Sequence, residues 1–151
     1  CVCSAANRPS YVGRLALASR CYRKKRRMPQ GKLLILDDDT TVGQIIQLSA
    51  QAYGFEARHF ADAAGFLAAV AAQDATHLAI DLTLPETSGV QVLRQVAALG
   101  SRCRIIICSG RGDEDLQAAL AEAHSLGLDC AGLLPKPFTL AVLKALLGVG
   151  S

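Results

Sequence analysis

The feature that most constrains the fold of this chain is a regular alternation between short aliphatic runs and longer segments with helical periodicity. The apolar runs, each short enough for one buried strand, lie at residues 33–36, 57–60, 78–80, 105–108 and 133–134. Segments with helical periodicity follow them at residues 41–53, 62–73, 89–99, 113–126 and 140–147. Strict alternation of this kind predicts an α/β fold, in which helices cover both faces of a five-stranded parallel sheet.

The two ends of the chain differ in charge. Residues 1–31 contain eight Lys or Arg and no acid, and they end in a basic run, residues 23–27, just before Met28. The other eight bases face 13 acids, so the rest of the chain has a net charge of −5. We expect residues 1–31 to be a flexible basic leader, either a product of upstream translation or a real tail, and residues 32–151 to be one domain.

Composition excludes several other classes of protein. With 51% hydrophobic and only 5% aromatic residues the chain is not disordered throughout, and its core should be aliphatic. No apolar run approaches the roughly 18 residues that a membrane-spanning helix needs, so we expect a cytoplasmic protein without membrane contact. Cys103, Cys108 and Cys130 lie in or beside apolar runs and are interpreted as buried free thiols. The cysteines lack the paired spacing of a zinc site, and the histidines lie in different elements.

Four acidic residues come directly after two of the predicted strands. Asp37, Asp38 and Asp39 follow the first strand, and Asp81 follows the third. The carboxyl ends of the strands form the binding edge of an open parallel sheet. In a flavodoxin-like doubly wound sheet, with strand order 2-1-3-4-5, the first and third strands are neighbours. This order brings Asp37, Asp38 and Asp81 into one crevice.

A crevice with three carboxylates predicts a bound cation. Two such charges about 4 Å apart repel by roughly 4 kcal/mol at an effective dielectric constant of 20. All candidate ligands are hard oxygens, which favours magnesium, manganese or calcium over zinc or copper. Ser109 and Gly110 end the fourth strand and Lys136 ends the fifth, so a hydroxyl and an ammonium group reach the same edge. A carboxylate with these neighbours can accept a phosphoryl group, and Asp81 is the natural acceptor.

These segments resemble the signature of the receiver domain of bacterial two-component response regulators. The motifs that carry the resemblance are Leu34-Ile35-Leu36-Asp37-Asp38-Asp39, Asp81-Leu82-Thr83-Leu84-Pro85 through Gly89, Ile107-Cys108-Ser109-Gly110 and Leu134-Pro135-Lys136-Pro137-Phe138. The resemblance covers residues 32 to about 148. It implies that Asp38, Asp81 and the main-chain carbonyl of Thr83 ligate Mg²⁺ and that Asp37 acts through water. It also implies that Lys136 and Ser109 bind the phosphoryl group on Asp81, and that the Lys136–Pro137 peptide bond is cis.

The resemblance further implies a signalling protein rather than an enzyme, with only self-phosphorylation and self-dephosphorylation. Its phosphodonor would be a sensor histidine kinase or a phosphotransfer protein, and its target a downstream partner or an output domain missing from this chain. Nucleic acid is not expected to bind the receiver itself. The output surface, which could also form a dimer, would consist of the fourth helix, the fifth strand and the fifth helix. The switch position that often carries an aromatic residue is Leu133 here, which weakens the usual aromatic readout.

Two further hints concern partners. Residues 127–132 form a slightly longer connection than in many receivers and resemble the receivers fused to cyclic-di-GMP phosphodiesterase modules. Exposed residues of the first helix, such as Gln44 and Gln47, are expected to select the cognate kinase.

Two alternative functions stay open at this point. A pseudo-receiver, which has the same fold but is never phosphorylated, is favoured by Leu133. A haloacid-dehalogenase-like phosphatase would use Asp37 as its nucleophile, because Asp37-Asp38-Asp39-Thr40-Thr41 matches the first motif of that family. That second alternative leaves Asp81 unexplained, and it requires acidic residues after Lys136, where the sequence has none.

Overall fold

The computed structural model describes residues 30–72, 74–110 and 113–149, and its centre is a five-stranded parallel sheet. The strands are β1 (Lys32–Leu36), β2 (Glu56–Phe60), β3 (His77–Asp81), β4 (Arg104–Ser109) and β5 (Asp129–Pro135). Their spatial order is β2-β1-β3-β4-β5, and every neighbouring pair is parallel. The predicted fold class and strand order are therefore confirmed.

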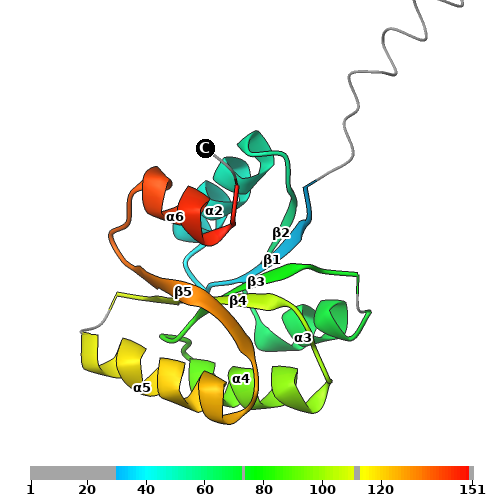
Figure 1. Ribbon diagram of the computed structural model, residues 1–151, viewed down its shortest axis with the longest axis vertical. Helices are drawn as coiled ribbons and strands as arrows, with labels where there is room; N and C mark the ends of the chain where they lie inside the picture. Colours follow the sequence, from blue (N-terminus) through cyan, green and yellow to red (C-terminus); the bar gives the residue numbers. More distant parts are fainter. Residues whose placement is uncertain (1–29, 73, 111–112, 150–151) are drawn as a thin grey trace, which may run out of the picture.

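Helices cover both faces of this sheet. They are α2 (Thr40–Ala52), α3 (Ala63–Ala71), α4 (Gly89–Ala98), α5 (Asp113–Ser125) and α6 (Leu140–Leu146). Figure 1 shows α2 and α6 on one face and α3, α4 and α5 on the other. Side-chain oxygens cap α2, α3, α4 and α6 at Asp39, Asp62, Ser88 and Thr139, because each accepts a hydrogen bond from an otherwise unpaired amide in the first turn.

The core consists of two apolar layers separated by the sheet. Leu34 and Leu36 of β1 pack with Phe66 on the side of α3, α4 and α5. Leu33 and Ile35, which alternate with them, pack on the opposite side with Ile46 of α2 and Leu143 of α6. Because β1 is buried on both faces, it reads as a continuous aliphatic run rather than as an alternating pattern.

Strand β5 is longer than the sequence predicts. Only residues 133–134 are an apolar run, yet the strand covers Asp129–Pro135. Pairing with β4 extends it, with a register shift opposite Ile105 and Ile106. At the shift Gly132 has φ 150, and a Cβ there would lie 2.5 Å from Leu146 Cδ2. The positive φ favours glycine here, so this part of the strand depends on its irregular pairing with β4, which no apolar pattern reveals.

Several smaller predictions can also be assessed. Cys103, Cys108 and Cys130 are free thiols, as predicted; Cys103 and Cys108 are buried, but Cys130 is only half-buried. Gln44 is exposed, but Gln47 is half-buried and donates a hydrogen bond to the Ala57 carbonyl (3.1 Å), so its side chain is engaged within the fold. Among residues 30–72, 74–110 and 113–149, no helix has the length and apolar character needed to span a bilayer. The leader prediction falls mainly on residues 1–29, outside the described part of the chain.

Candidate functional site

The carboxyl ends of β1 and β3 bring three carboxylates together. The two strands are neighbours, with Leu36 opposite Ile80, so the acids just after β1 and the acid that ends β3 lie side by side. One oxygen each of Asp37, Asp38 and Asp81 lies within 4.8 Å of the other two. Asp37 and Asp81 are only 1% and 2% exposed, whereas Asp38 is exposed. The predicted cluster is thus present, with two buried members and one at the surface.

Asp37 is held by hydrogen bonds on every side. Its Oδ1 accepts from the Asp39 amide (2.9 Å) and its Oδ2 from Lys136 Nζ (2.6 Å). Its main-chain carbonyl lies 2.7 Å from His59 Nε2. A buried carboxylate needs such partners, because desolvation without hydrogen bonds is costly. Asp39 has a different role, since its Oδ1 caps α2 at the amides of Thr41 and Val42.

Asp81 is also fixed in place, and its burial affects its charge. Its Oδ1 accepts from the Thr83 amide (3.1 Å), and its Oδ2 lies 3.4 Å from Lys136 Nζ. Burial raises the pKa of Asp81, and the nearby charge of Asp37 adds to this, although the Thr83 amide and Lys136 act in the opposite direction. Burial likewise raises the pKa of the adjacent Cys108 thiol to about 12, so this cysteine stays protonated.

Lys136 connects the two buried carboxylates. Burial lowers its pKa, but the hydrogen bond and charge of Asp37, together with the charge of Asp81, outweigh this and raise the pKa overall. The ammonium group is therefore charged at neutral pH. The three carboxylates of the cluster and this ammonium leave an excess of negative charge that a divalent cation would balance.

The ends of β4 and β5 complete the site. The Lys136 amide donates to the Ser109 carbonyl (2.8 Å), and the Lys136–Pro137 peptide bond is cis, as the resemblance implies. An open pocket of about 380 Å³ is lined by Asp37, Asp38, Asp39, Asp81, Thr83, Gly110 and Lys136. Ser109 is 0% exposed and is not one of the lining residues, and Leu133 is half-buried against the core on the side of α3, α4 and α5.

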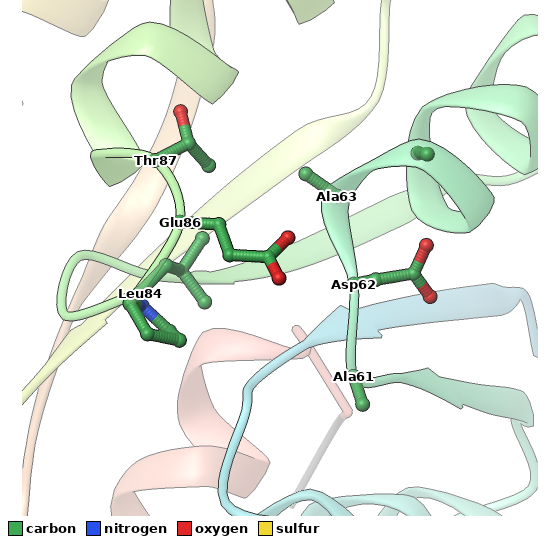
Figure 2. Close-up of a pocket in the computed structure, with 8 residues that line it drawn as sticks. Ala61, Asp62, Ala63, Leu84, Glu86 and Thr87 are labelled. Carbon is green, nitrogen blue, oxygen red and sulfur yellow. The ribbon is translucent and has the colours of Figure 1, made fainter.

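A second pocket lies between the β2–α3 and β3–α4 connections. It measures about 280 Å³, and its lining consists largely of alanine, leucine and proline side chains. Figure 2 shows Glu86 pointing toward the α3 side and the Asp62 carboxylate pointing away from Glu86. Asp62 is occupied in capping α3 through the Gly65 amide. The acidic cluster lies in the first pocket, which is therefore the better candidate for the functional site.

The donor set of the first pocket suits a hard cation. Every candidate ligand atom is an oxygen, and the carboxylates already converge. Thr83 also lines this pocket, and its Oγ1 is buried without a hydrogen-bond partner in the described part of the chain. Magnesium needs few protein ligands, since it keeps several waters. The residues present therefore fit a magnesium site.

Comparison with known proteins identifies the family. The family model of the response regulator receiver domain matches residues 33–148, which is more than half of the chain. The chain belongs to this family. The transcriptional regulatory protein FixJ of Azorhizobium caulinodans is 30% identical over 118 residues, covering 76% of this chain and 54% of FixJ. The response regulator protein TmoT of Ectopseudomonas mendocina is 35% identical over 94 residues, covering 62% of this chain and 43% of TmoT. This receiver thus spans about half the length of the relatives it matches.

Solved structures share the receiver fold. The chemotaxis protein CheY4 of Vibrio cholerae has a TM-score of 0.67 at 23% identity, covering 82% of this chain and 100% of CheY4. A response regulator from Colwellia psychrerythraea has a TM-score of 0.65 at 25% identity, covering 81% of this chain and 95% of its own. Family membership favours the receiver over the haloacid-dehalogenase interpretation, as does the position of Asp81 inside the acidic cluster.

The sequence missed one contributor to the site, His59. Its hydrogen bond to the Asp37 carbonyl depends on the pairing of β2 with β1 and on the approach of α2. A single histidine near the end of a predicted strand gives no signal of this role. Only the arrangement of these three elements reveals it.

Proposed function

We propose that this receiver accepts a phosphoryl group on the Asp81 carboxylate and thereby passes a signal in a two-component phosphorelay. The single observation that supports this most is the convergence of Asp37, Asp38 and Asp81 with Lys136 in one open pocket. Asp38, Asp81 and the main-chain carbonyl of Thr83 would hold Mg²⁺, with Asp37 acting through water. The phosphodonor would be a sensor histidine kinase or a phosphotransfer protein.

The residues divide the chemistry among them. An Asp81 oxygen attacks phosphorus, the bond from phosphorus to the donor histidine nitrogen breaks, and an acyl phosphate forms while the imidazole leaves. The divalent ion, when bound, neutralises charge on the phosphoryl oxygens. Lys136 Nζ, already 3.4 Å from Asp81 Oδ2, would pair with the same oxygens. The Ser109 hydroxyl would then bond to the phosphoryl group and connect it to β4.

The same site favours a signalling role over turnover of a separate substrate. The covalent product stays on the protein, so its consequence is a change in the surface that a partner reads. That partner is a separate protein or an output domain, for which a cyclic-di-GMP phosphodiesterase module is one candidate. Such a signal would act in the cytoplasm, where phosphodonor kinases present their phosphohistidine.

The decisive experiment is phosphorylation by a small-molecule acyl phosphate in the presence of Mg²⁺, followed by intact-mass spectrometry. Wild type should gain one phosphoryl group that hydroxylamine removes, and chelation of Mg²⁺ should prevent the gain. Asp81→Asn should gain none. Asp62→Asn, which removes a helix-capping acid outside the pocket, is the matched control and should behave as wild type. Undiminished phosphorylation of Asp81→Asn would refute the assignment.

Leu133 is the one observation that favours the pseudo-receiver as a second candidate. It occupies β5 opposite Ile107, where an aromatic switch residue is often found in the family the sequence resembles. If wild type gains no phosphoryl group at saturating phosphodonor and Mg²⁺, the pseudo-receiver becomes the better description.

A further inference from the structure

We infer that His59 is a positioning residue for the metal-binding loop at residues 37–39. This inference rests on the proposed function, because it concerns the Mg²⁺ site that phosphorylation of Asp81 would use. His59 lies on β2, an edge strand that contributes none of the residues lining the acidic pocket. Its effect on the site would therefore pass through the main chain of Asp37.

The geometry defines which atom of His59 acts. The ring Nε2 lies 2.7 Å from the Asp37 carbonyl oxygen. A carbonyl can only accept, so Nε2 must carry the hydrogen and donate it. The main chain of the same residue is tied to the same strand, since the Asp37 amide donates to the Phe60 carbonyl (3.1 Å). Strand β2 thus holds Asp37 by both its amide and its carbonyl.

This contact controls the direction of Asp38. The Asp37 carbonyl belongs to the peptide unit that joins Asp37 to Asp38, and a peptide unit is planar. Fixing its oxygen fixes the orientation of the whole unit, from which Asp38 projects. On the other side of Asp38, the Asp39 amide is held by Asp37 Oδ1. The exposed Asp38 side chain is consequently presented between two anchored points, and His59 supplies one of them.

The sequence makes room for this histidine at Gly43. This glycine is one turn into α2, where its amide donates to the Asp39 carbonyl, and it is buried. A Cβ at position 43 would overlap the His59 ring at Nε2, Cδ2 and Cε1. The ring therefore fits between β2 and α2 only because residue 43 has no side chain. Gly43 and His59 form a matched pair, and a change at one should depend on the other.

Residues that hold metal ligands in position contribute to metal affinity, and losing one typically weakens metal binding by about 10-fold to 100-fold. We expect His59→Ala to weaken Mg²⁺ binding by about 10-fold, at the low end, because His59 holds main chain rather than a ligand side chain. His59→Gln retains a donor at the same distance along the side chain and should stay within about threefold of wild type. The matched control is His77→Ala, which removes a half-buried histidine from the start of β3, at the edge of the sheet opposite the pocket, and should leave Mg²⁺ affinity unchanged.

The experiment measures the Mg²⁺ dissociation constant by calorimetry, the melting temperature, and the Mg²⁺ dependence of phosphorylation by the acyl phosphate. A merely structural role for His59 would lower the melting temperature without moving the dissociation constant. The positioning role predicts a raised Mg²⁺ requirement for phosphorylation in His59→Ala, with the wild-type rate restored at saturating Mg²⁺. Unchanged affinity in His59→Ala would overturn the inference, and so would a His59→Gln variant as weak as His59→Ala.

A double-mutant cycle with Gly43→Ala gives an independent test. In the wild-type background the added methyl displaces the ring and should weaken Mg²⁺ binding, even though alanine favours the helix. In the His59→Ala background the methyl meets no ring, so it should have no further effect on affinity. Equal losses in both backgrounds would overturn the pairing.

The same data separate the inference from the proposed function. If wild type binds Mg²⁺ and accepts the phosphoryl group while the His59 variants match it, only the inference fails. If wild type neither binds Mg²⁺ nor accepts the phosphoryl group, the proposed function fails and the inference fails with it.

Discussion

Three aspartates of one cluster have three different environments, and this difference determines what each can do. Asp37 is fixed by Lys136 and by the Asp39 amide, which suits a structural acid. Asp81 is buried but faces the pocket, which suits a nucleophile that must be presented in one orientation. Asp38 is exposed, which suits a ligand that meets a hydrated ion.

Asp38→Asn tests the crowding of these charges. Without metal the variant should melt higher than wild type, because one repelling charge is removed; at about 4 Å such repulsion is worth roughly 1 kcal/mol in water-like surroundings. The increment that Mg²⁺ adds should shrink, because a ligand is lost. At a Mg²⁺ concentration ten times its dissociation constant, binding stabilises wild type by about 1.4 kcal/mol, which raises the melting temperature by roughly 3 to 5 °C. Thermal melts with and without Mg²⁺ measure both the metal-free melting temperature and its rise on adding Mg²⁺. A lower metal-free melting temperature in the variant would contradict the crowding argument.

Asp81 should make the metal-free protein less stable as pH rises. Burial raises its folded-state pKa above the unfolded value of about 3.9, so folding favours the protonated form. Its contribution is fully present below the unfolded pKa and is lost as pH rises through the folded pKa. Asp81→Asn is neutral at every pH and cannot lose this contribution. In urea unfolding from pH 4 to 7.5, the free energy of unfolding of Asp81→Asn minus that of wild type should increase with pH. A difference that does not change with pH would contradict the raised pKa of Asp81.

Among the elements, the start of α4 shows how closely a helix approaches the site. The β3–α4 connection folds back through a bridge between Thr83 and Ser88, and it brings Gly89 against the end of β3. A Cβ at Gly89 would lie 2.6 Å from Leu82 Cα and 2.8 Å from the Asp81 carbonyl oxygen. Because these are main-chain atoms, they cannot move aside without displacing Asp81 itself.

Gly89→Ala should therefore destabilise the protein by about 1 to 2 kcal/mol, since overpacking costs more than the gain in helix propensity returns. Chemical denaturation measures the change. Gly110→Ala is the matched control, because the nearest atom to its Cβ would be Lys136 Cβ at 4.0 Å. That control should stay within about 0.5 kcal/mol of wild type. Equal stability of the two variants would show that the end of β3 yields to the added methyl.

The elements that the sequence predicted well are those with a local signal. Continuous aliphatic runs located β1 and β4, and the acids directly after β1 and β3 located the pocket, because parallel strands end at one edge. The local sequence pattern could not predict the first half of β5, because that half forms a strand only through its pairing with β4 around Gly132. Nor could it give the complete burial of Ser109 or the contact of His59 with Asp37, since both depend on how separate elements pack.

At the scale of the whole molecule, the site should communicate with the face made by α5, β5 and α6. Lys136 follows β5 directly, its amide donates to the Ser109 carbonyl, and Leu133 of β5 packs against the core. Amide NMR with a beryllofluoride phosphoryl mimic and Mg²⁺ should therefore shift resonances across this face, with modest amplitude because Leu133 is not aromatic. Asp81→Asn under the same conditions should show no such shifts. Shifts confined to the pocket would favour the pseudo-receiver.

The ion pair between Lys136 and Asp37 joins residues 99 positions apart in the sequence. During synthesis Asp37 emerges from the ribosome early, and its ammonium partner emerges only near the end of the domain. A nascent chain that stops before β5 contains the acids but lacks the ammonium group that pairs with two of them. The charge balance of the pocket therefore depends on the complete domain, because its ammonium group comes from the last strand and its acids from the first and third.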